Sequence, residues 1–383
     1  MNLRKLFDFF SSDLGVDLGT ANTLVYARGR GIVVNEPSLV ALNKKTHKIE
    51  AFGRDAKEML GRTPRDLVAI EPLKEGVIAN FDMTEKMLRR FISQAQREGR
   101  VIKPKVVIGV PGQANVVELR ALEDAAYRAK GRKVFMAPER VPAAIGAGLP
   151  TNEPRASMVV DLGAGTTDIA VLSLSGIVYA HEVRVAGRSL DEAIIEYIKG
   201  RRKLLMGKVR AEGIKIEMGW GLRLGKPLWG RVSGRSVTEG APRTITVTEG
   251  EVREALTGPL NVITRAVREA LARVPPELSN DLVDRGIIIT GGTALLRNLD
   301  RRLMEETGLP VTVDENALSS VALGASRMLE DAHLLSRSTY EALGDLDKAV
   351  HYGRQAQAIL RESPSLLAIH WKAAATIARL ERD

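Results

Sequence analysis

The sequence contains no cysteine, few aromatic residues and no long apolar run. The absence of cysteine excludes disulfide bonds and thiolate metal sites, and it fits a reducing compartment. Aromatic residues make up only 4% of the chain, and no basic stripe is interleaved with them, so we expect no nucleic-acid partner. No run of about 18 or more apolar residues occurs, and we therefore expect no membrane-spanning helix.

What is present is the composition of a soluble globular protein, with 44% hydrophobic and 27% charged residues over 383 positions. A chain of this length predicts two domains or one duplicated pair, with sizeable cores. The formal net charge of +9 permits an anionic membrane surface as a partner.

One pattern occurs twice in the chain. Residues 15–26 and 158–171 each predict a strand, a tight glycine turn and a second strand. Both contain Val-Asp-Leu-Gly, which places Asp17 and Asp161 144 positions apart, about one domain length. The repetition predicts an internal duplication around which the rest of the chain is arranged.

The residue types in these two turns suit phosphate and a divalent cation. Glycine lets backbone N–H groups approach an anion closely, and successive amides form a nest for phosphate oxygens. A neighbouring carboxylate would repel phosphate unless a cation lay between them, so Asp17 and Asp161 predict Mg²⁺ held through water. For a single copy, an ordinary hairpin turn is the better interpretation. Two matched copies at domain spacing favour the phosphate site.

A third glycine turn follows the apolar strand predicted over residues 285–290. Gly291 and Gly292 lie between that strand and a helix predicted over residues 295–307. A strand, a glycine turn and a helix N-terminus in succession favour an anionic or nucleotide ligand. A simple α/β turn explains the same pattern equally well.

Four features thus follow one another: the first Asp turn, an isolated Glu139 before a small-residue helix, the second Asp turn and the Gly-Gly turn. With strings such as VDLGTANTLVY, SMVVDLGAGTTDIAV and ITGGTALLRNLDRRLMEETGLPV, this order resembles the actin, hexokinase and heat-shock-chaperone ATPase superfamily. Within it the chain most resembles the MreB family of bacterial actin-like rod-shape proteins, from residue 1 to about 328. The resemblance implies an α/β fold: a duplicated actin-like (ribonuclease-H-like) ATPase with two lobes around a nucleotide cleft, plus a C-terminal helical extension.

The resemblance also implies a site for ATP or ADP with Mg²⁺. Glu139 is expected to position the attacking water, and Asp17 and Asp161 are expected to act with it at the metal. Glu212 and Lys215 are expected to reach the ribose and base. The remaining nucleotide-binding positions lie in the three turns: Gly19, Thr20, Ala21 and Asn22; Gly163, Ala164, Gly165 and Thr166; and Gly291, Gly292, Thr293, Ala294 and Leu295.

Two departures from the family pattern lie in the site, and the second concerns hydrolysis more than binding. Ala164 stands where the family usually has the middle of three glycines, and its methyl group fits the turn if φ stays negative. The family usually shows Glu-Glu-Pro at the catalytic carboxylate, whereas this chain has Pro138-Glu139-Arg140 with Pro142 downstream. The second departure favours a slow ATPase.

The chain divides into residues 1–12, lobe I at 13–150, lobe II at 151–328 with an inserted strand-rich subdomain at about 190–260, and a helical tail at 329–383. The first segment is either an interfacial membrane anchor or a helix packed on its own domain. Its candidate membrane contacts are Leu3, Leu6, Phe7, Phe9 and Phe10. The tail contains one tetratricopeptide-like hairpin, which either packs locally or docks on a partner that the sequence does not name.

We therefore expect an ATP-binding, slowly hydrolysing actin-like protein that polymerises on the inner, cytoplasmic face of the membrane. By resemblance it would organise the cell-wall elongation machinery and help determine bacterial cell shape. One alternative is a non-polymerising nucleotide-binding scaffold that uses its tail as an adaptor. A small-molecule kinase of the same fold would need a carboxylate base near a sugar pocket, and a chaperone would need a β-rich substrate domain. The sequence offers a candidate for neither.

Overall fold

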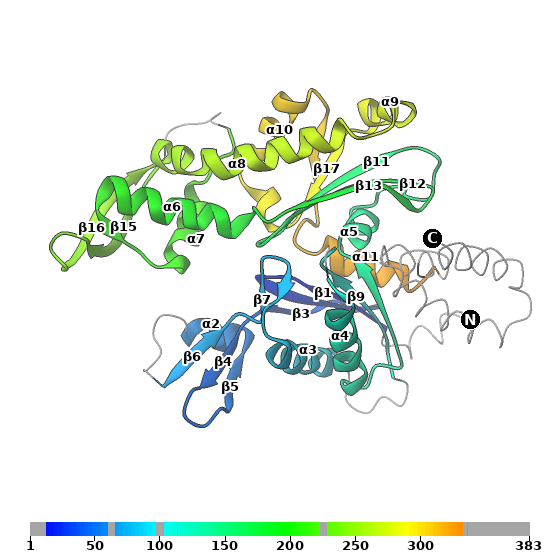
Figure 1. Cartoon of the computed structure of the whole chain (residues 1–383), viewed down its shortest axis with the longest axis horizontal. Helices are drawn as coiled ribbons and strands as arrows, with labels where there is room; N and C mark the ends of the chain where they lie inside the picture. The colour runs from blue at the N-terminus through cyan, green and yellow to red at the C-terminus, as the bar shows by residue number, and fades with distance from the viewer. Residues whose placement is uncertain are drawn as a thin grey trace, which may run out of the picture.

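The computed structural model describes residues 13–59, 66–96, 103–112, 114–222, 228–331 and 335. The predictions for residues 1–12, with their five candidate membrane contacts, and for nearly all of the tail lie outside these residues. Two lobes lie side by side in Figure 1, each built on a five-stranded sheet. Among the described helices, none is long and apolar enough to cross a membrane.

The two large sheets have the same topology, which confirms the predicted duplication. The first sheet has the order β10-β9-β1-β2-β3, and the second has β18-β17-β11-β12-β13 when its order is given from the matching edge. β1 pairs antiparallel with β2 and parallel with β9, which comes much later in the chain. In the same way, β11 pairs antiparallel with β12 and parallel with β17. The strands are β1 Leu14–Leu18, β2 Asn22–Ala27, β3 Gly31–Pro37, β9 Lys105–Val110, β10 Lys133–Pro138, β11 Ser157–Leu162, β12 Thr167–Ser173, β13 Gly176–Val183, β17 Ile287–Thr290 and β18 Val311–Val313.

Helices cover the sheets and also lie between them. Those of the described chain are α2 Gly53–Met59, α3 Phe81–Ala95, α4 Val116–Arg128, α5 Arg140–Gly146, α6 Gly187–Arg202, α7 Lys208–Met218, α8 Glu249–Leu271, α9 Pro276–Arg285, α10 Leu299–Thr307 and α11 Ser320–Met328, with a 3₁₀ turn η1 at Gly292–Leu295. Each lobe has its own hydrophobic core. A third core cluster joins the lobes, because α5 and α11 pack between Val107 of β9 and Val159 of β11 (Figure 1).

Glycine allows α5 and α11 to cross at close range. A Cβ added to Gly146 of α5 would overlap the carbonyl oxygen of Ser320. A Cβ added to Gly324 of α11 would overlap the carbonyl oxygen of Pro142. The backbones of the two helices therefore touch directly at the junction of the lobes, where any larger residue would push them apart.

Each lobe also carries a small outer sheet. The first lobe has β5-β4-β6 and a β7-β8 hairpin, and the second has β14-β15-β16 within the stretch where strands were expected. The bounds are β4 Val40–Asn43, β5 Ile49–Phe52, β6 Leu67–Ile70, β7 Leu73–Lys74, β8 Val77–Ile78, β14 Leu204–Leu205, β15 Trp229–Ser236 and β16 Pro242–Thr248. The β5-β4-β6 and β14-β15-β16 sheets lie at the outer ends of the two lobes, whereas the β7-β8 hairpin lies between the lobes (Figure 1), with Gly76 of its turn next to Thr166.

The region of the β14-β15-β16 sheet is strongly basic. Residues 199–243 contain 12 of the 56 Lys and Arg residues of the chain but only 3 of the 47 Asp and Glu residues. The excess of 9 cations equals the net charge of the whole protein, so all other residues together are neutral. Five exposed cations of this region make no ion pair within the described chain: Lys203, Lys208, Arg231, Arg235 and Arg243.

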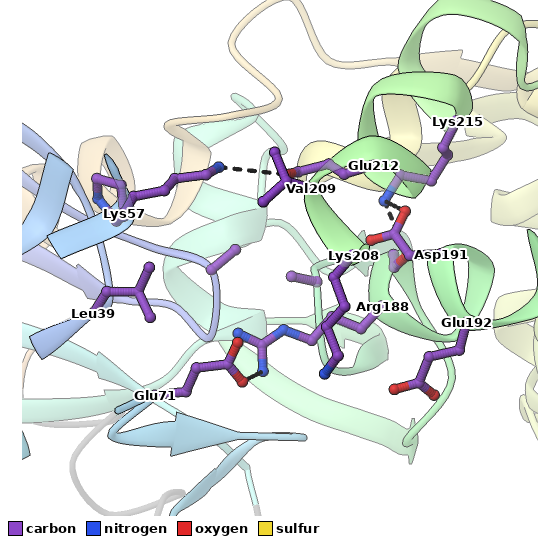
Figure 2. A pocket seen from close by; sticks show the side chains of 14 residues that line it. Leu39, Lys57, Glu71, Arg188, Asp191, Glu192, Lys208, Val209, Glu212 and Lys215 are labelled. Carbon is purple, nitrogen blue, oxygen red and sulfur yellow. Dashed lines mark hydrogen bonds and ion pairs between the residues drawn. The ribbon is translucent and has the colours of Figure 1, made fainter. Parts of the chain in front are cut away.

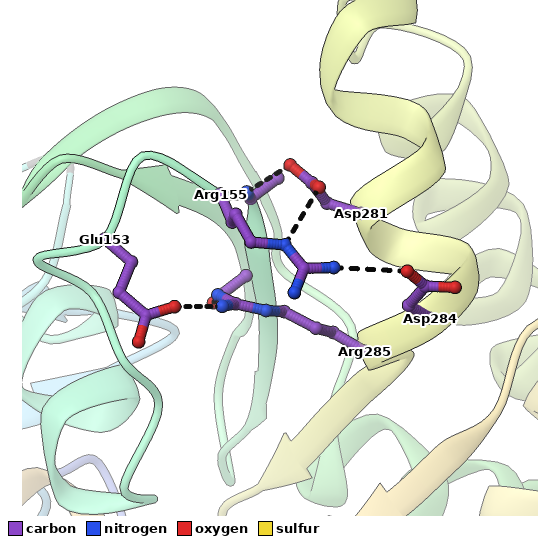
Figure 3. A network of polar contacts seen from close by, with 7 residues as sticks. Glu153, Arg155, Asp281, Asp284 and Arg285 are labelled. Atoms are coloured by element: carbon purple, nitrogen blue, oxygen red, sulfur yellow. Dashed lines mark hydrogen bonds and ion pairs between the residues drawn. The ribbon is translucent and has the colours of Figure 1, made fainter.

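A polar network joins α9 to the segment that enters β11 (Figure 3). Arg155 contacts Asp281 at 3.2 Å and Asp284 at 3.1 Å. The carboxylate of Asp281 also accepts a hydrogen bond from the backbone N–H of Ala156 at 2.8 Å. This hydrogen bond is the largest of several causes that lower the pKa of the Asp281 carboxyl. Arg285 pairs with Glu153 in the same way. The network sets the start of β11, and hence the second Asp turn, relative to α9.

Two predicted elements around the Gly-Gly turn are wrong in their bounds. The strand expected over residues 285–290 begins at Ile287, because Arg285 is the last residue of α9. The helix expected over residues 295–307 begins at Leu299, and η1 precedes it. The chain is extended at Leu296, which is 9% exposed and packs in the core of the second lobe, and left-handed at Asn298. Because α10 starts only after this break, its N-terminus does not abut the Gly-Gly turn, and the ligand-binding capacity of the turn rests on its own backbone.

Candidate functional site

A cleft between the lobes brings together residues that are far apart in the sequence. Its empty volume is about 1440 Å³, including its opening to solvent. The predicted residues that line it are Asp17, Gly19, Thr20, Ala21, Asn22, Glu139, Asp161, Gly163, Ala164, Gly165, Thr166, Glu212, Lys215, Gly291, Gly292, Thr293 and Leu295. Ala294 is instead buried in the core of the second lobe.

The first two glycine turns approach each other from opposite lobes. A Cβ added to Gly165 would lie 2.9 Å from Thr20 Oγ1. Ser38 holds the first turn in place, because its hydroxyl donates to the Gly19 carbonyl oxygen at 2.6 Å. Two such turns are able to hold one polyphosphate chain between their backbone N–H groups.

The second turn accommodates its alanine without strain. The N–H of Gly163 donates to the Thr166 carbonyl at 2.9 Å and closes the turn. Ala164 is not among the residues with positive φ, so its methyl group is compatible with the backbone. The carbonyl of Gly163 accepts the Thr293 hydroxyl at 2.7 Å, which ties the second turn to the third.

The third turn requires glycine at its first position. Gly291 has a φ of 85°, in the region that favours glycine. A Cβ there would overlap the carbonyl oxygen of Leu162 and the carboxylate of Asp161. The turn therefore lies directly against the end of β11, beside the second Asp turn.

Three carboxyl groups, those of Asp17, Glu139 and Asp161, line the cleft beside these turns. Burial raises the pKa of Asp17 to about 7. Burial, followed by repulsion from Asp17 and Asp168, raises the pKa of Asp161 well above its usual range. The pKa of Glu139 is raised well above its usual range by burial and then by repulsion from Asp17, Asp168, Asp161 and Glu182. The cluster brings several carboxyl groups together where solvent is excluded, so ionising all of them at once is unfavourable.

A divalent cation fits this cluster. Buried carboxylates that repel one another are stabilised by a nearby cation, and Mg²⁺ prefers oxygen ligands and keeps several waters. Within the part of the chain that the structure describes, no three His, Asp or Glu side chains converge closely enough to hold one ion. Asp17 and Asp161, which line the cleft beside the glycine turns, are the residues that would hold the ion there.

Glu212 and Lys215 project from α7 toward the cleft, as neighbours on one helix face. Lys215 Nζ lies 2.9 Å from Asp191 Oδ1 and donates to the Gly187 carbonyl at 2.9 Å. Ile216 also lines the cleft, and its side chain is exposed. This wall of the cleft therefore offers an apolar surface as well as charged groups. A nucleoside, with its flat base and polar ribose, matches that combination.

Sequence reasoning missed a second acidic pair next to the predicted carboxylates. Asp168 lies directly opposite Asp161 in the β11–β12 ladder and is 2% exposed. Burial raises its pKa, and burial raises the pKa of Glu182 to about 7, while the charge of Arg140 opposes both shifts. The signal was available, because the hairpin register that places Asp161 at the turn also places Asp168 across from it.

Sequence reasoning also missed two ion pairs that bridge the lobes at the mouth of the cleft (Figure 2). Lys57 Nζ lies 3.3 Å from Glu212 Oε2, and Arg188 Nη1 lies 2.8 Å from Glu71 Oε2. The partners are 155 and 117 positions apart in the chain. No local pattern in the sequence marks such distant partners.

Two equivalent sheets, a glycine helix crossing and three turns that line one interlobe cleft define an actin-like protein. The structure is similar to MreB5 of Spiroplasma citri bound to AMPPNP, with a TM-score of 0.79 and 32% identity, covering 83% of this chain and 95% of that one. It is also similar in fold to MamK in its double helical filament, with a TM-score of 0.70 and 24% identity, covering 83% of this chain and 98% of that one.

The family model of the MreB/Mbl protein matches residues 11–337. The chain is 49% identical over 333 residues to the cell shape-determining protein MreB of Escherichia coli (strain K12), covering 86% of this chain and 96% of that protein. It is 46% identical over 328 residues to the cell shape-determining protein Mbl of Bacillus subtilis (strain 168), covering 86% and 98%. The chain belongs to the MreB/Mbl family.

Proposed function

We propose that this chain binds ATP with Mg²⁺ and polymerises into actin-like filaments that help determine cell shape. The observation that carries the proposal is the approach of two glycine turns from opposite lobes, with Asp17 and Asp161 beside them in one cleft. The relatives support it: two of them are named cell shape-determining proteins, and the Spiroplasma citri protein was solved with AMPPNP and with ADP.

The reaction that fits this site is transfer of the terminal phosphoryl group of ATP to water, which yields ADP and phosphate. The backbone N–H groups of the turns bind the phosphates, and Glu139 orients the attacking water. Mg²⁺, when bound, neutralises charge on the phosphate oxygens. Only ionised Glu139 accepts a hydrogen bond from that water, and a cation beside the cluster favours the ionised form. A filament with this site would assemble with ATP and weaken after hydrolysis.

The proposed location is the inner face of the cytoplasmic membrane, with further copies of the chain and the cell-wall elongation machinery as partners. Membrane contact is assigned to residues 1–12, which combine Leu3, Leu6, Phe7, Phe9 and Phe10 with two basic residues. One such segment binds weakly, but many copies on one filament bind together. Polymerisation and membrane attachment would therefore reinforce each other.

Electron microscopy of the purified chain with Mg-ATP, with and without anionic liposomes, tests this function. We expect filaments that lie on the vesicles. A truncated chain that lacks residues 1–12 should still polymerise but should leave the vesicles bare. Discrete particles under every condition would contradict the proposal and favour the non-polymerising adaptor, and attention would move to the partner of the tail.

The role of Glu139 leads to a separate expectation. Glu139→Gln removes the charge that orients water while keeping the side chain's size, so phosphate release should slow by about 100-fold at unchanged ATP affinity. Steady-state phosphate release and a direct ATP titration measure the two quantities. Glu58→Gln, at an exposed position, is the control and should change neither. Unchanged turnover in Glu139→Gln would mean that another group positions the water.

A further inference from the structure

The two lobes are joined at the mouth of the cleft by side chains as well as by the α5–α11 crossing. Lys57 belongs to α2 of the first lobe, and its partner Glu212 belongs to α7 of the second. Glu71 follows β6 in the first lobe, and its partner Arg188 lies in the first turn of α6 in the second. Figure 2 shows both pairs spanning the same opening.

Arg188 connects this opening to both phosphate-binding turns. Its Nη2 donates to the carbonyl oxygen of Thr20 in the first turn at 2.9 Å. Its backbone N–H donates to the carbonyl oxygen of Ala164 in the second turn at 2.8 Å. One residue of the second lobe thus contacts Glu71 and both turns, and a change in the lobe separation must alter at least one of these bonds.

Glu212 faces two cavities at once. It lines the nucleotide cleft, and it also lines an adjoining cavity of about 750 Å³, including open space, whose walls contain Lys57, Glu71 and Arg188. The carboxylate that was predicted to reach the ribose is therefore held from the opposite lobe by Lys57. A nucleotide bound beside Glu212 that leaves through this adjoining cavity must move past the Lys57–Glu212 ion pair or break it.

We propose that Lys57 and Arg188 are positioning residues of the nucleotide site, which hold the lobes together across its mouth and slow the release of bound nucleotide. The inference rests on the proposed nucleotide-binding function. Lys57 and Glu212 have side chains that are 41% and 38% exposed, so their pair is a weak contact in high dielectric. The side chains of Arg188 and Glu71 are 23% and 31% exposed, and Arg188 has the additional bond to Thr20, so this second contact is the stronger one.

The test measures release of a fluorescent ATP analogue, bound with Mg²⁺ to the full chain, after mixing with excess ATP. Lys57→Ala should release it about 3-fold faster, because a surface pair contributes less than about 1 kcal/mol, a factor of about 5. Glu71→Gln, which leaves the Arg188 bond to Thr20 in place, should release it about 5-fold faster. The double variant, with Lys57→Ala and Glu71→Gln together, should combine the two effects. Because salt screens ion pairs, 0.5 M salt should accelerate release from the wild-type chain more than from the double variant.

Matched variants separate this role from general stabilisation. Lys45→Ala removes a surface pair with Asp66 inside the first lobe, at 2.8 Å, and should leave release unchanged. Lys57→Arg keeps the charge and should retain slow release of the analogue. If Lys57 had a purely structural role, Lys57→Ala would shift the melting temperature of the nucleotide-free chain without changing the release rate. Release at the wild-type rate in the double variant would overturn the inference alone. Failure of the wild-type chain to bind the analogue would overturn the proposed function as well.

Discussion

Asp161→Asn should lower the affinity for Mg-ATP by roughly 10–100-fold and at the same time make the nucleotide-free chain more stable. In the proposed site this carboxylate orients the metal through water, and loss of such a group typically weakens binding by that factor. The same carboxylate is buried beside Asp17 and Asp168, which raise its pKa by repulsion in addition to burial. An uncharged amide of the same shape removes that repulsion.

Thermal unfolding with and without Mg-ATP measures both effects. The variant without ligand should melt higher by roughly 1–2 °C at pH 8, because about 1 kcal/mol shifts the melting temperature of a chain of 383 residues by about 1 °C. Mg-ATP at about ten times the wild-type dissociation constant should raise the melting temperature of the wild-type chain clearly and that of the variant only slightly. Asp124→Asn, at an exposed position on α4, should resemble the wild-type chain in both respects. An intact response to Mg-ATP in Asp161→Asn would refute the site assignment.

The pH dependence supplies a second readout of the same cluster. The folded-state pKa values of Asp17 and Glu182 are raised to about 7. Between about pH 4 and pH 7 the folded chain therefore keeps protons that the unfolded chain has released, so the free energy of unfolding should fall as pH rises through this range. Asp161→Asn removes one of the titrating groups and should make the fall shallower.

Gly324→Ala should be among the most damaging single-methyl changes in the protein. The added Cβ would overlap the carbonyl oxygen of Pro142 on the facing helix, and the backbones of α5 and α11 would have to separate. We expect a loss of about 3 kcal/mol in the free energy of unfolding, at the upper end for overpacking. Because Glu139 immediately precedes α5, ATP turnover should fall as well.

The matched control for this change has the opposite expected sign. Gly200 lies exposed in α6, and a Cβ there would meet no atom within 4 Å. Gly200→Ala should therefore stabilise the chain by roughly 0.5–1 kcal/mol, because alanine is the better helix former. Denaturant unfolding of the two variants side by side measures the difference. Equal stabilities would show that the α5–α11 crossing has room to spare.

The sequence was sufficient to predict the duplicated fold because the evidence for it is local. Each Asp turn lies within one short hairpin, and the two copies at Asp17 and Asp161 are recognisable without knowledge of any long-range contact. The same holds for Ala164, whose compatibility with the turn depends only on its own φ. Family resemblance then supplied Glu139, Glu212 and Lys215, which the structure places in one cleft with the turns.

The features that were missed depend on tertiary context. The pairs of Lys57 with Glu212 and Arg188 with Glu71 connect segments that meet only after both lobes have formed. The start of α10 was predicted four residues too early, because helix periodicity does not reveal that burial of Leu296 requires an extended backbone there. Glycine at position 324 looks unremarkable in a small-residue helix until the facing helix is known.

The exposed cations without ion pairs that were described above give one end of the protein a local excess of positive charge. They lie in and beside the β14-β15-β16 sheet, which is at one end of the long axis (Figure 1). In the field of an extended anionic surface such a molecule turns before it makes contact, with this sheet leading. At physiological ionic strength the torque acts only within about 8 Å of the surface, so orientation is decided in the last step of approach.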